Sequence, residues 1–338
     1  MEHRFLGSTG LKVSELCLGT QTFGWVAEEK TAHDALDRFS EQGGNFLDTA
    51  DVYNQGRSES ILGSWLRKRG NRQSLVLCSK VFFEAGPGPN DTGLSRRHLF
   101  QALEASLRRL GTDHLDLYQA HCYDYTTRIE ETLGAFRDLQ AAGKIRCIGV
   151  SNWNASQLMK GLLLGRQQFG LSIASLQAEY SLMVRSTEWE LLPVCRQEGL
   201  GFLAWSPLAG GWLSGKYRRG EAPPENSRVG RKDRWDDQPE QRESEGTWKV
   251  LEALLQVARS LGKTPAQVAL NWLLQRGDVV PILGARTLEQ LEENLGAAGW
   301  RLGAGELSLL DAASDPGLPY PYRFLERYAK RKGFTAPA

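Results

Sequence analysis

Four side chains with complementary chemistry stand out along the sequence. Asp48, Lys80 and His121 each come directly after a short apolar, strand-like segment, and Tyr53 lies five residues after Asp48. In a barrel of parallel strands, catalytic residues sit at the carboxyl ends of several different strands. A carboxylate, a phenol, an amine and an imidazole placed in this way would converge on one point. Such a set is suited to protonating a carbonyl oxygen.

The phenol of Tyr53 is the expected proton donor. A tyrosine with an unperturbed pKa of about 10 is a poor acid at neutral pH. We expect the ammonium of Lys80 to lower that pKa by stabilising the phenolate, Asp48 to keep Lys80 charged, and a neutral His121 to hold the carbonyl. Each residue alone has a structural alternative, namely a buried tyrosine, a surface lysine, a turn aspartate or a core histidine. The combination indicates a catalytic site.

Strand-like segments alternate with helix-like patterns and divide the chain into eight units. The expected strand ends are Gly19, Asp48, Lys80, His121, Ser151, Gln177, Trp205 and Pro281. Six of the seven gaps between them fit one strand and one helix, and the seventh is long enough for an insertion. Eight units favour a closed parallel barrel over an open doubly wound sheet. We therefore predict an α/β fold, a (β/α)8 barrel, with an extra helix and a loop at 218–246 before the last strand. That loop is either mobile or a lid over cofactor or substrate.

Capping residues and helical periodicity locate individual elements. Ser95 is an expected N-cap and Gly111 an expected C-cap of one helix, with an apolar stripe between them. Similar signals predict helices over Thr31–Gln42, Trp248–Leu261 and Thr264–Gln275, and a hairpin formed by His3–Leu6 and Lys12–Ser14.

Eight sequence stretches, in order from the N-terminus to about residue 300, carry a family resemblance. They are GTQTFG (Gly19–Gly24), NFLDTADVY (Asn45–Tyr53), LCSKV (Leu77–Val81), SLRRLGTDHLDLYQAH (Ser106–His121), GKIRCIGVSN (Gly143–Asn152), LQAEYS (Leu176–Ser181), WSPLAGGWLSGKY (Trp205–Tyr217) and PILGARTLEQLEEN (Pro281–Asn294). The chain resembles the aldo-keto reductase family, in its bacterial-type and potassium channel β-subunit-like branch. The resemblance implies one barrel domain over residues 1–338, with the hairpin capping its N-terminal mouth. It also implies the catalytic roles given above for Tyr53, Asp48, Lys80 and His121.

The resemblance further implies a nicotinamide cofactor. Ser151, Asn152 and Gln177 would bind the carboxamide, and Trp205 stands where the family commonly has a tyrosine that stacks on the nicotinamide ring. Arg286 would contact a 2′-phosphate, which favours NADPH over NADH. The whole expected cofactor set is Gly19, Thr20, Gln21, Asp48, Ser151, Asn152, Gln177, Trp205, Ser206, Pro207, Leu208, Gly210, Gly211, Lys216, Gly284, Arg286, Thr287, Gln290, Glu293 and Asn294.

Two segments of that set have features of their own. Gly210–Lys216 fits the GxxxxGK pattern of a P-loop, but Tyr217 replaces the Ser or Thr that binds magnesium there. Close approach of the backbone to a pyrophosphate explains the glycines equally well. In the second segment, Thr287 is expected to cap a helix whose N-terminus can receive a phosphate. Gln290 and Asn294, one turn apart, are expected to reach the adenine.

Aromatic residues follow several of the expected strand ends. Trp25, Phe82, Phe83 and Tyr123, with Tyr125 and Trp153 nearby, are the candidates for a substrate pocket that receives an aldehyde or ketone. Some of these rings must simply pack in the core.

Composition excludes several classes of partner. The formal net charge is +1, from 41 basic and 40 acidic residues, which gives no support for nucleic-acid or membrane-surface binding. The N-terminus lacks the apolar segment of a signal peptide. Five scattered cysteines without a CxxC pattern indicate reduced thiols. We expect a cytoplasmic protein without a metal site, and the sequence leaves its oligomeric state open.

These observations favour an NADPH-dependent reductase of aldehydes or ketones. Two alternatives remain open at this point. One is an NADPH-binding regulatory partner with incidental turnover, as in the potassium channel β-subunits that share the family fold. The other is a dehydrogenase that oxidises an alcohol or a sugar with NAD or NADP.

Overall fold

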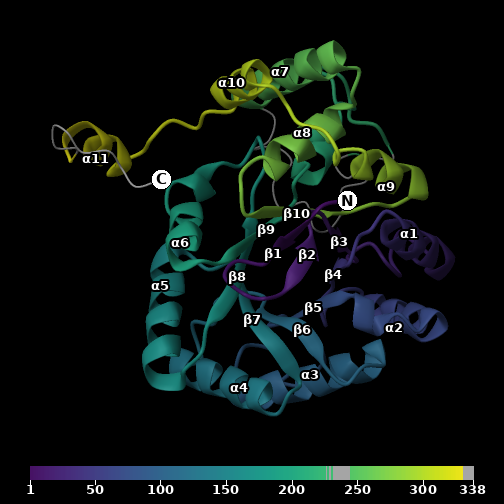
Figure 1. Cartoon of the computed structure of the whole chain (residues 1–338), viewed down its shortest axis with the longest axis vertical. Coiled ribbons are helices and arrows are strands. Elements are labelled where there is room, and N and C mark those ends of the chain that lie inside the picture. Colours follow the sequence, from purple (N-terminus) through teal and green to yellow (C-terminus); the bar gives the residue numbers. More distant parts are fainter. Residues whose placement is uncertain (226, 228–229, 231–243, 330–338) are drawn as a thin grey trace.

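The computed structural model describes residues 1–225, 227, 230 and 244–329. Eight parallel strands form a closed barrel in the order β10-β3-β4-β5-β6-β7-β8-β9 (Figure 1). The strands are β3 (Cys17–Gly19), β4 (Phe46–Asp48), β5 (Val76–Val81), β6 (Leu115–Ala120), β7 (Ile145–Ser151), β8 (Ile173–Glu179), β9 (Gly201–Trp205) and β10 (Val279–Leu283). The predicted (β/α)8 barrel is confirmed. Most of the expected 218–246 insertion, including any lid, lies outside the described residues.

Side-chain alternation along the strands determines which residues face the barrel interior. Successive side chains of a strand point to opposite faces. Val76 and Cys78 of β5 belong to the core inside the barrel, whereas Leu77 and Val81 pack against the surrounding helices. Lys80 therefore shares the inward face, at the carboxyl end of its strand. Asp48 is placed in the same way on β4, two residues after Phe46 of the interior core.

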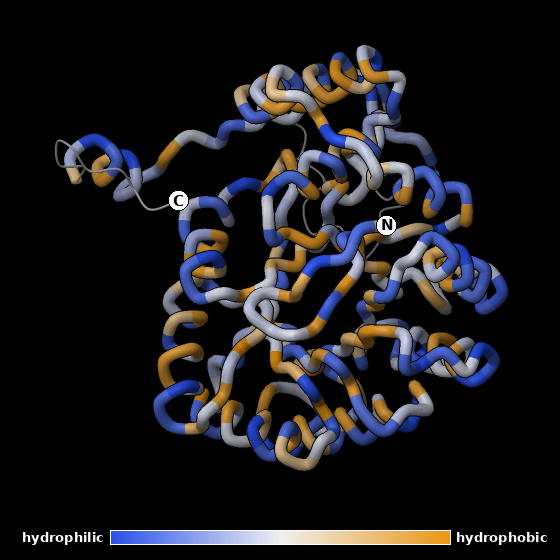
Figure 2. Tube along the Cα trace, viewed as in Figure 1, coloured by the Kyte–Doolittle hydropathy of each residue, from blue (hydrophilic) through white to orange (hydrophobic). Residues whose placement is uncertain are grey.

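Most of the described α-helices surround the barrel and bury one face each, so apolar and polar residues alternate along them (Figure 2), whereas the last helix, Tyr322–Tyr328, has no buried residue. The described α-helices are α1 (Glu29–Glu41), α2 (Arg57–Arg69), α3 (Arg96–Leu110), α4 (Ile129–Ala141), α5 (Ala155–Leu164), α6 (Leu191–Glu198), α7 (Glu245–Leu261), α8 (Pro265–Leu274), α9 (Leu288–Leu295), α10 (Ala304–Ala313) and α11 (Tyr322–Tyr328). Short helices are η1 (Arg72–Ser74), η2 (Gly165–Phe169), η3 (Ser186–Glu188) and η4 (Ala209–Ser214). Within the described ranges, no helix is long and apolar enough to cross a membrane.

The predicted caps of α3 are confirmed. The side chain of Ser95 accepts a hydrogen bond from the backbone N–H of His98, and Gly111 ends the helix with a φ of 67°. The helix predicted from Trp248 begins earlier, at Glu245, because the side chain of Ser244 caps it.

The predicted hairpin is confirmed as β1 (His3–Phe5) and β2 (Lys12–Ser14). Leu6 and Val13 belong to the core inside the barrel. Gly7 lies so close to the start of β9 that a Cβ there would meet the carbonyl oxygen of Gly199 at 2.4 Å. The hairpin thus closes the amino end of the barrel, where it lies across the strands in Figure 1, and leaves the carboxyl end for the site.

Candidate active site

Backbone strain gathers at the carboxyl end of the barrel. In the described ranges, the residues other than glycine with a positive φ are Asn54, Gln55, Asn152, Ser206 and Ala209. All five lie in loops that directly follow β4, β7 and β9. Such conformations cost free energy and persist where the surrounding structure holds them, which is typical of functional sites. The strain therefore marks this end of the barrel independently of any motif.

Lys80 is the centre of the candidate site. Its ammonium is fully buried and donates hydrogen bonds to Asp48 Oδ2 at 2.6 Å, to the backbone oxygen of Thr49 at 2.9 Å and to Tyr53 OH at 3.0 Å. These three contacts use all three N–H groups of the ammonium. Asp48 and Lys80, predicted from strand ends, and Tyr53, five residues after Asp48, therefore do converge. The Thr49 carbonyl was not foreseen, because a backbone acceptor has no signature in the sequence.

The pKa values of Lys80 and Tyr53 are both raised, but for different reasons. Burial opposes the charge of Lys80, but Asp48 and Tyr53 outweigh it and raise the pKa of the lysine above its usual value. Burial raises the pKa of Tyr53, and the opposing effect of Lys80 is smaller. Lys80 therefore lowers the pKa of Tyr53, as expected, but burial exceeds this effect and the net shift of the pKa is upward. The phenol keeps its proton at neutral pH.

His121 lies one residue beyond β6 and faces the same point. Its ring is 5.9 Å from the ring of Tyr53, edge to face. Burial, and secondarily the charge of Lys80, hold the pKa of His121 well below its usual value, so the imidazole is neutral. The Nδ1 atom is buried and has no hydrogen-bond partner in the part of the chain that the structure describes. The fourth predicted catalytic residue thus joins the other three as a neutral group.

Gln177 and Asn152 extend the site across β8 and β7. Gln177 Nε2 donates to Asp48 Oδ1 at 3.0 Å, which leaves the amide oxygen as the group that Gln177 can offer to a ligand. Asn152 Nδ2 donates to the backbone oxygen of His121 at 2.9 Å, and its Oδ1 accepts from Trp205 Nε1 at 3.0 Å. The amide of Asn152 therefore joins Trp205 to the His121 segment. Ser151, which ends β7, accepts the second hydrogen bond of the same amide.

Hydrogen bonds hold the loops after β3 and β4 together beside Tyr53. Asn54 Nδ2 donates to the backbone oxygens of Gln21 and Phe23 at 3.0 and 2.7 Å. Thr20, predicted as a cofactor contact, is fully buried, and its hydroxyl donates to the backbone oxygen of Asp48 at 3.1 Å. Thr20 and Asn54 thus hold the segment that carries Tyr53. The sequence analysis did not identify Asn54.

The loop after β9 makes an irregular turn. Gly210 and Gly211 have φ values of 67° and 97° inside η4, and Ser206 and Ala209 are also left-handed. The segment thus has no P-loop geometry, in which a strand and a glycine-rich loop lead into an α-helix. Pro207 is buried, Leu208 is half-buried, and Lys216 is exposed at the end of this turn.

The segment after β10 is held by its own side chains. Thr287 caps α9 by accepting from the N–H of Gln290, as predicted. Gln290 Oε1 accepts from the N–H of Arg286 at 3.0 Å, and the buried Asn294 donates to the backbone oxygen of Gly284. Both amides therefore stabilise the loop between β10 and α9. Glu293, the next residue of the predicted set, is half-buried on α9.

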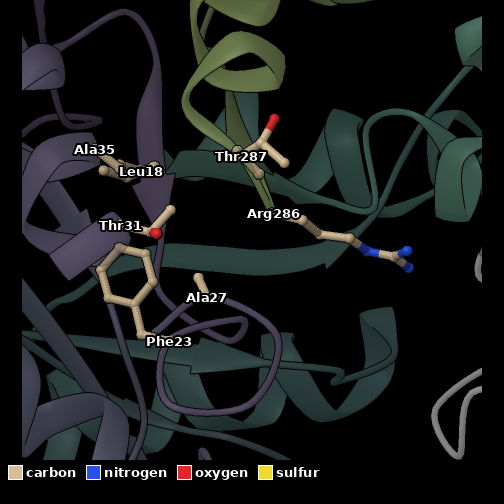
Figure 3. A pocket seen from close by; sticks show the side chains of 8 residues that line it. Leu18, Phe23, Ala27, Thr31, Ala35, Arg286 and Thr287 are labelled. Atoms are coloured by element: carbon tan, nitrogen blue, oxygen red, sulfur yellow. The ribbon is translucent and has the colours of Figure 1, made fainter. Parts of the chain in front are cut away.

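Arg286 and Thr287 lie at a small crevice between this segment and the start of α1. The remaining lining residues are Leu18, Phe23, Ala27, Thr31, Ala35 and Ala285. In Figure 3 the guanidinium of Arg286 extends away from the apolar side chains of the crevice. A charged group at the N-terminus of α9 is thus directed away from the core.

Two groups of aromatic rings flank the site. The ring centroid of Phe83 lies 4.8 Å from that of His121 and 5.2 Å from that of Phe82. The ring centroid of Tyr123 lies 5.1 Å from those of Tyr125 and Trp153. Trp153 is buried and therefore packs in the core, whereas 38% of Phe83 is exposed beside His121. Trp25 is half-buried in the loop after β3.

Within the described ranges, no group of three or more His, Cys, Asp or Glu residues is arranged so that it could hold a metal ion. The groups that the structure does bring together at the site are the charged lysine, the neutral imidazole and the protonated phenol.

Comparisons of the sequence with known proteins identify its relatives. The sequence profile of the aldo/keto reductase family matches residues 15–315. The chain is 38% identical to an uncharacterized oxidoreductase, YrpG, of Bacillus subtilis, over 94% of this chain and 97% of that protein. It is 36% identical to a probable voltage-gated potassium channel subunit beta of Arabidopsis thaliana, over 88% and 91%, and 33% identical to a norsolorinic acid reductase of Aspergillus flavus, over 96% and 84%. The chain belongs to the aldo/keto reductase family.

Proposed function

We propose that the protein is an NADPH-dependent reductase of aldehydes or ketones, with Tyr53 as the general acid. The observation that carries this proposal is the position of Lys80 Nζ, bonded at once to Asp48 and to the hydroxyl of Tyr53. A buried ammonium bonded to a phenol stabilises the phenolate that remains after proton transfer. The catalytic need is for stabilisation of that phenolate as it forms.

The residues of the chain divide the proton chemistry among them. Tyr53 holds its proton until negative charge develops on the carbonyl oxygen, and then donates it to that oxygen. The neutral imidazole of His121 can donate an N–H to the same oxygen and orient it without competing as an acid. Lys80, kept charged by Asp48, then faces the phenolate of Tyr53. The carbonyl carbon receives a hydride and the oxygen receives a proton, so the product is an alcohol.

The residues also fit a nicotinamide cofactor, which when bound supplies the hydride. The amide oxygen of Gln177 can accept from a carboxamide. The strained turn over Ser206 and Ala209 with Gly210 and Gly211 presents backbone at the barrel mouth, and no atom lies within 4 Å of a Cβ built at Gly284. This open backbone suits the close approach of phosphates.

The preference for NADPH rests on Arg286. Its position beside the N-cap of α9 joins a guanidinium to a helix N-terminus, and both favour a phosphate.

Five free cysteines are consistent with a cytoplasmic location, which we also propose.

The test is NADPH oxidation, followed by absorbance, with a panel of aromatic aldehydes, aliphatic aldehydes and small sugars. Tyr53→Phe removes only the proton donor, so we expect turnover to fall by about a hundredfold or more, with NADPH affinity nearly unchanged. Tyr322→Phe, on the exposed helix α11, is the matched control and should leave turnover unaltered. Turnover of Tyr53→Phe within a few-fold of the wild type would contradict the mechanism.

The similarity to a probable voltage-gated potassium channel subunit beta suggests a second function. A regulatory protein of that kind would bind NADPH tightly and turn over none of the carbonyl compounds. The same assay, combined with a binding titration, separates that outcome from reductase activity.

A further inference from the structure

A second cluster of ionisable groups lies behind the catalytic site. It occupies the space between the outer face of the barrel and helices α2 and α3. Its members are Asp51, which follows β4, Glu59 of α2, Arg109 of α3 and Tyr118 of β6. The mechanism proposed above uses none of them.

Asp51 is the unusual member of this cluster. Its side chain is 2% exposed, and no side chain in the part of the chain that the structure describes donates a hydrogen bond to either carboxyl oxygen. The backbone N–H of the adjacent Val52 favours the charged form, but its effect is smaller than that of burial. A buried carboxylate without a side-chain donor or a cation of its own is unfavourable, so such a group keeps its proton instead.

Arg109, the cation near Asp51, already pairs with another carboxylate. Glu59 is fully buried, and its two oxygens accept from Arg109 Nε at 2.7 Å and from Ser79 Oγ at 2.6 Å. Arg109 thus balances the charge of Glu59. If Asp51 also became charged, two buried carboxylates would share one guanidinium.

The charged groups packed around Asp51 act on its pKa in both directions. Burial raises the pKa of Asp51 to about 8, and Glu59 of α2 adds to the increase. Arg109 of α3, the backbone N–H of Val52 and Lys80 of β5 oppose it to a smaller extent. Tyr118 of β6 has a pKa well above its usual value, so it stays neutral, and its buried hydroxyl also lacks a partner in the described ranges.

Asp51 is directly coupled to the catalytic residues through the backbone. Its N–H donates to the backbone oxygen of Lys80 at 3.2 Å. Two residues earlier, the Thr49 oxygen accepts from Lys80 Nζ, and two residues later Tyr53 OH accepts from the same ammonium. Asp51 is therefore the middle residue of a five-residue loop whose ends both contact Lys80.

We propose that Asp51 is a positioning residue that acts as a neutral carboxylic acid, and that the loss of its proton displaces the loop that holds Tyr53 against Lys80. The inference rests on the proposed role of Tyr53. An ionised Asp51 must gain water or move away from Glu59, and either change shifts the loop. The reductase would then lose activity at alkaline pH before Tyr53 itself ionises, because the pKa of that phenol is raised above its ordinary value.

The first test observes the carboxyl group without turnover. In wild-type protein labelled with carbon-13 at aspartate carboxyls, we expect one resonance to titrate near pH 8 and to be missing in Asp51→Asn. If no aspartate titrates above about pH 6, well clear of the ordinary value, the proposal is wrong. This measurement needs no substrate, so its failure is distinct from a failure of the reductase assignment.

The second test observes the effect on Tyr53. With ring-labelled tyrosine, the Tyr53 resonance, assigned by its absence in Tyr53→Phe, should shift near pH 8 in the wild type and not in Asp51→Asn. In the kinetic assay, kcat/KM of the wild type should fall about tenfold per pH unit above that point, as for the loss of one proton. That decline should be absent from Asp51→Asn.

Asp124→Asn is the matched control. Asp124 is also buried after a strand end, but hydrogen bonds from Thr126, Thr127 and Leu94 overcome its burial and lower its pKa to about 2. It is charged throughout the range, so its variant should retain both the Tyr53 shift and the alkaline decline. An Asp51→Asn variant that retains them as well would overturn the proposal.

Discussion

The buried ion pair of Lys80 and Asp48 makes a quantitative prediction for Asp48→Asn. The two side chains are 0% and 3% exposed, and Lys80 Nζ lies 2.6 Å from Asp48 Oδ2. Asparagine keeps the shape of the aspartate but removes its charge. Removing one partner from a buried pair leaves an uncompensated charge and typically costs roughly 3–5 kcal/mol. We expect the free energy of unfolding to fall by about that amount at neutral pH.

The pH dependence of this loss has a definite sign. In the wild type, the folded-state pKa of Lys80 is above its ordinary value of 10.5. The stabilisation that the charged Lys80 provides is therefore fully present below pH 10.5. It is lost as pH rises through the folded-state pKa. In Asp48→Asn, burial without the carboxylate lowers the pKa of Lys80. The variant should then gain stability as pH rises toward 10.5, and the difference from the wild type should narrow.

Urea unfolding followed by the fluorescence of the ten tryptophans measures both effects. The control is Asp34→Asn, which removes the partner of Lys30 in a pair whose side chains are 44% and 89% exposed. An exposed pair is worth about 0–1 kcal/mol. A loss in Asp48→Asn no larger than in the control, or a loss that does not change with pH, would refute the assignment of Lys80 as a buried, charged group.

Two further substitutions test other parts of the structure. Arg286→Ala should weaken NADPH binding by about 2 kcal/mol if the contact is a charge-assisted hydrogen bond, and NADH binding far less, as measured by fluorescence titration; an equal loss for both would show that Arg286 does not contact the 2′-phosphate. Arg109→Met should leave the buried Glu59 without its cation and lower the free energy of unfolding by roughly 3–5 kcal/mol. A small change in thermal stability would mean that Glu59 does not depend on Arg109.

Much of the fold can be predicted from local sequence. Ser95 and Gly111 bound α3 because capping depends on the residue itself and on the few that follow it. Alternation along β5 places Lys80 on the inward face with Cys78, since the period of a strand is two. The order of eight strand–helix units then leaves the barrel as the consistent arrangement.

The contacts between α9 and the loop before it show where local reasoning stops. Gln290 and Asn294 lie on α9, as expected, and their amides bond to the backbone of Arg286 and Gly284 in that loop; their contact with an adenine stays a prediction. Helical spacing identifies which residues are neighbours on one helix. It does not identify the loop that contacts them in the folded protein.

The sequence by itself determined the types and order of the candidate catalytic groups and the strand ends that carry Asp48, Lys80 and His121. Only the tertiary structure decided their protonation. The pKa of Tyr53 is raised rather than lowered because burial, which depends on every element packed around the phenol, exceeds the effect of one ammonium at 3.0 Å. Asp51 became a neutral acid for the same reason, since the charge on Arg109 is already balanced by Glu59 from another helix. Desolvation and charge pairing are sums over the whole fold, so no single segment of sequence contains them.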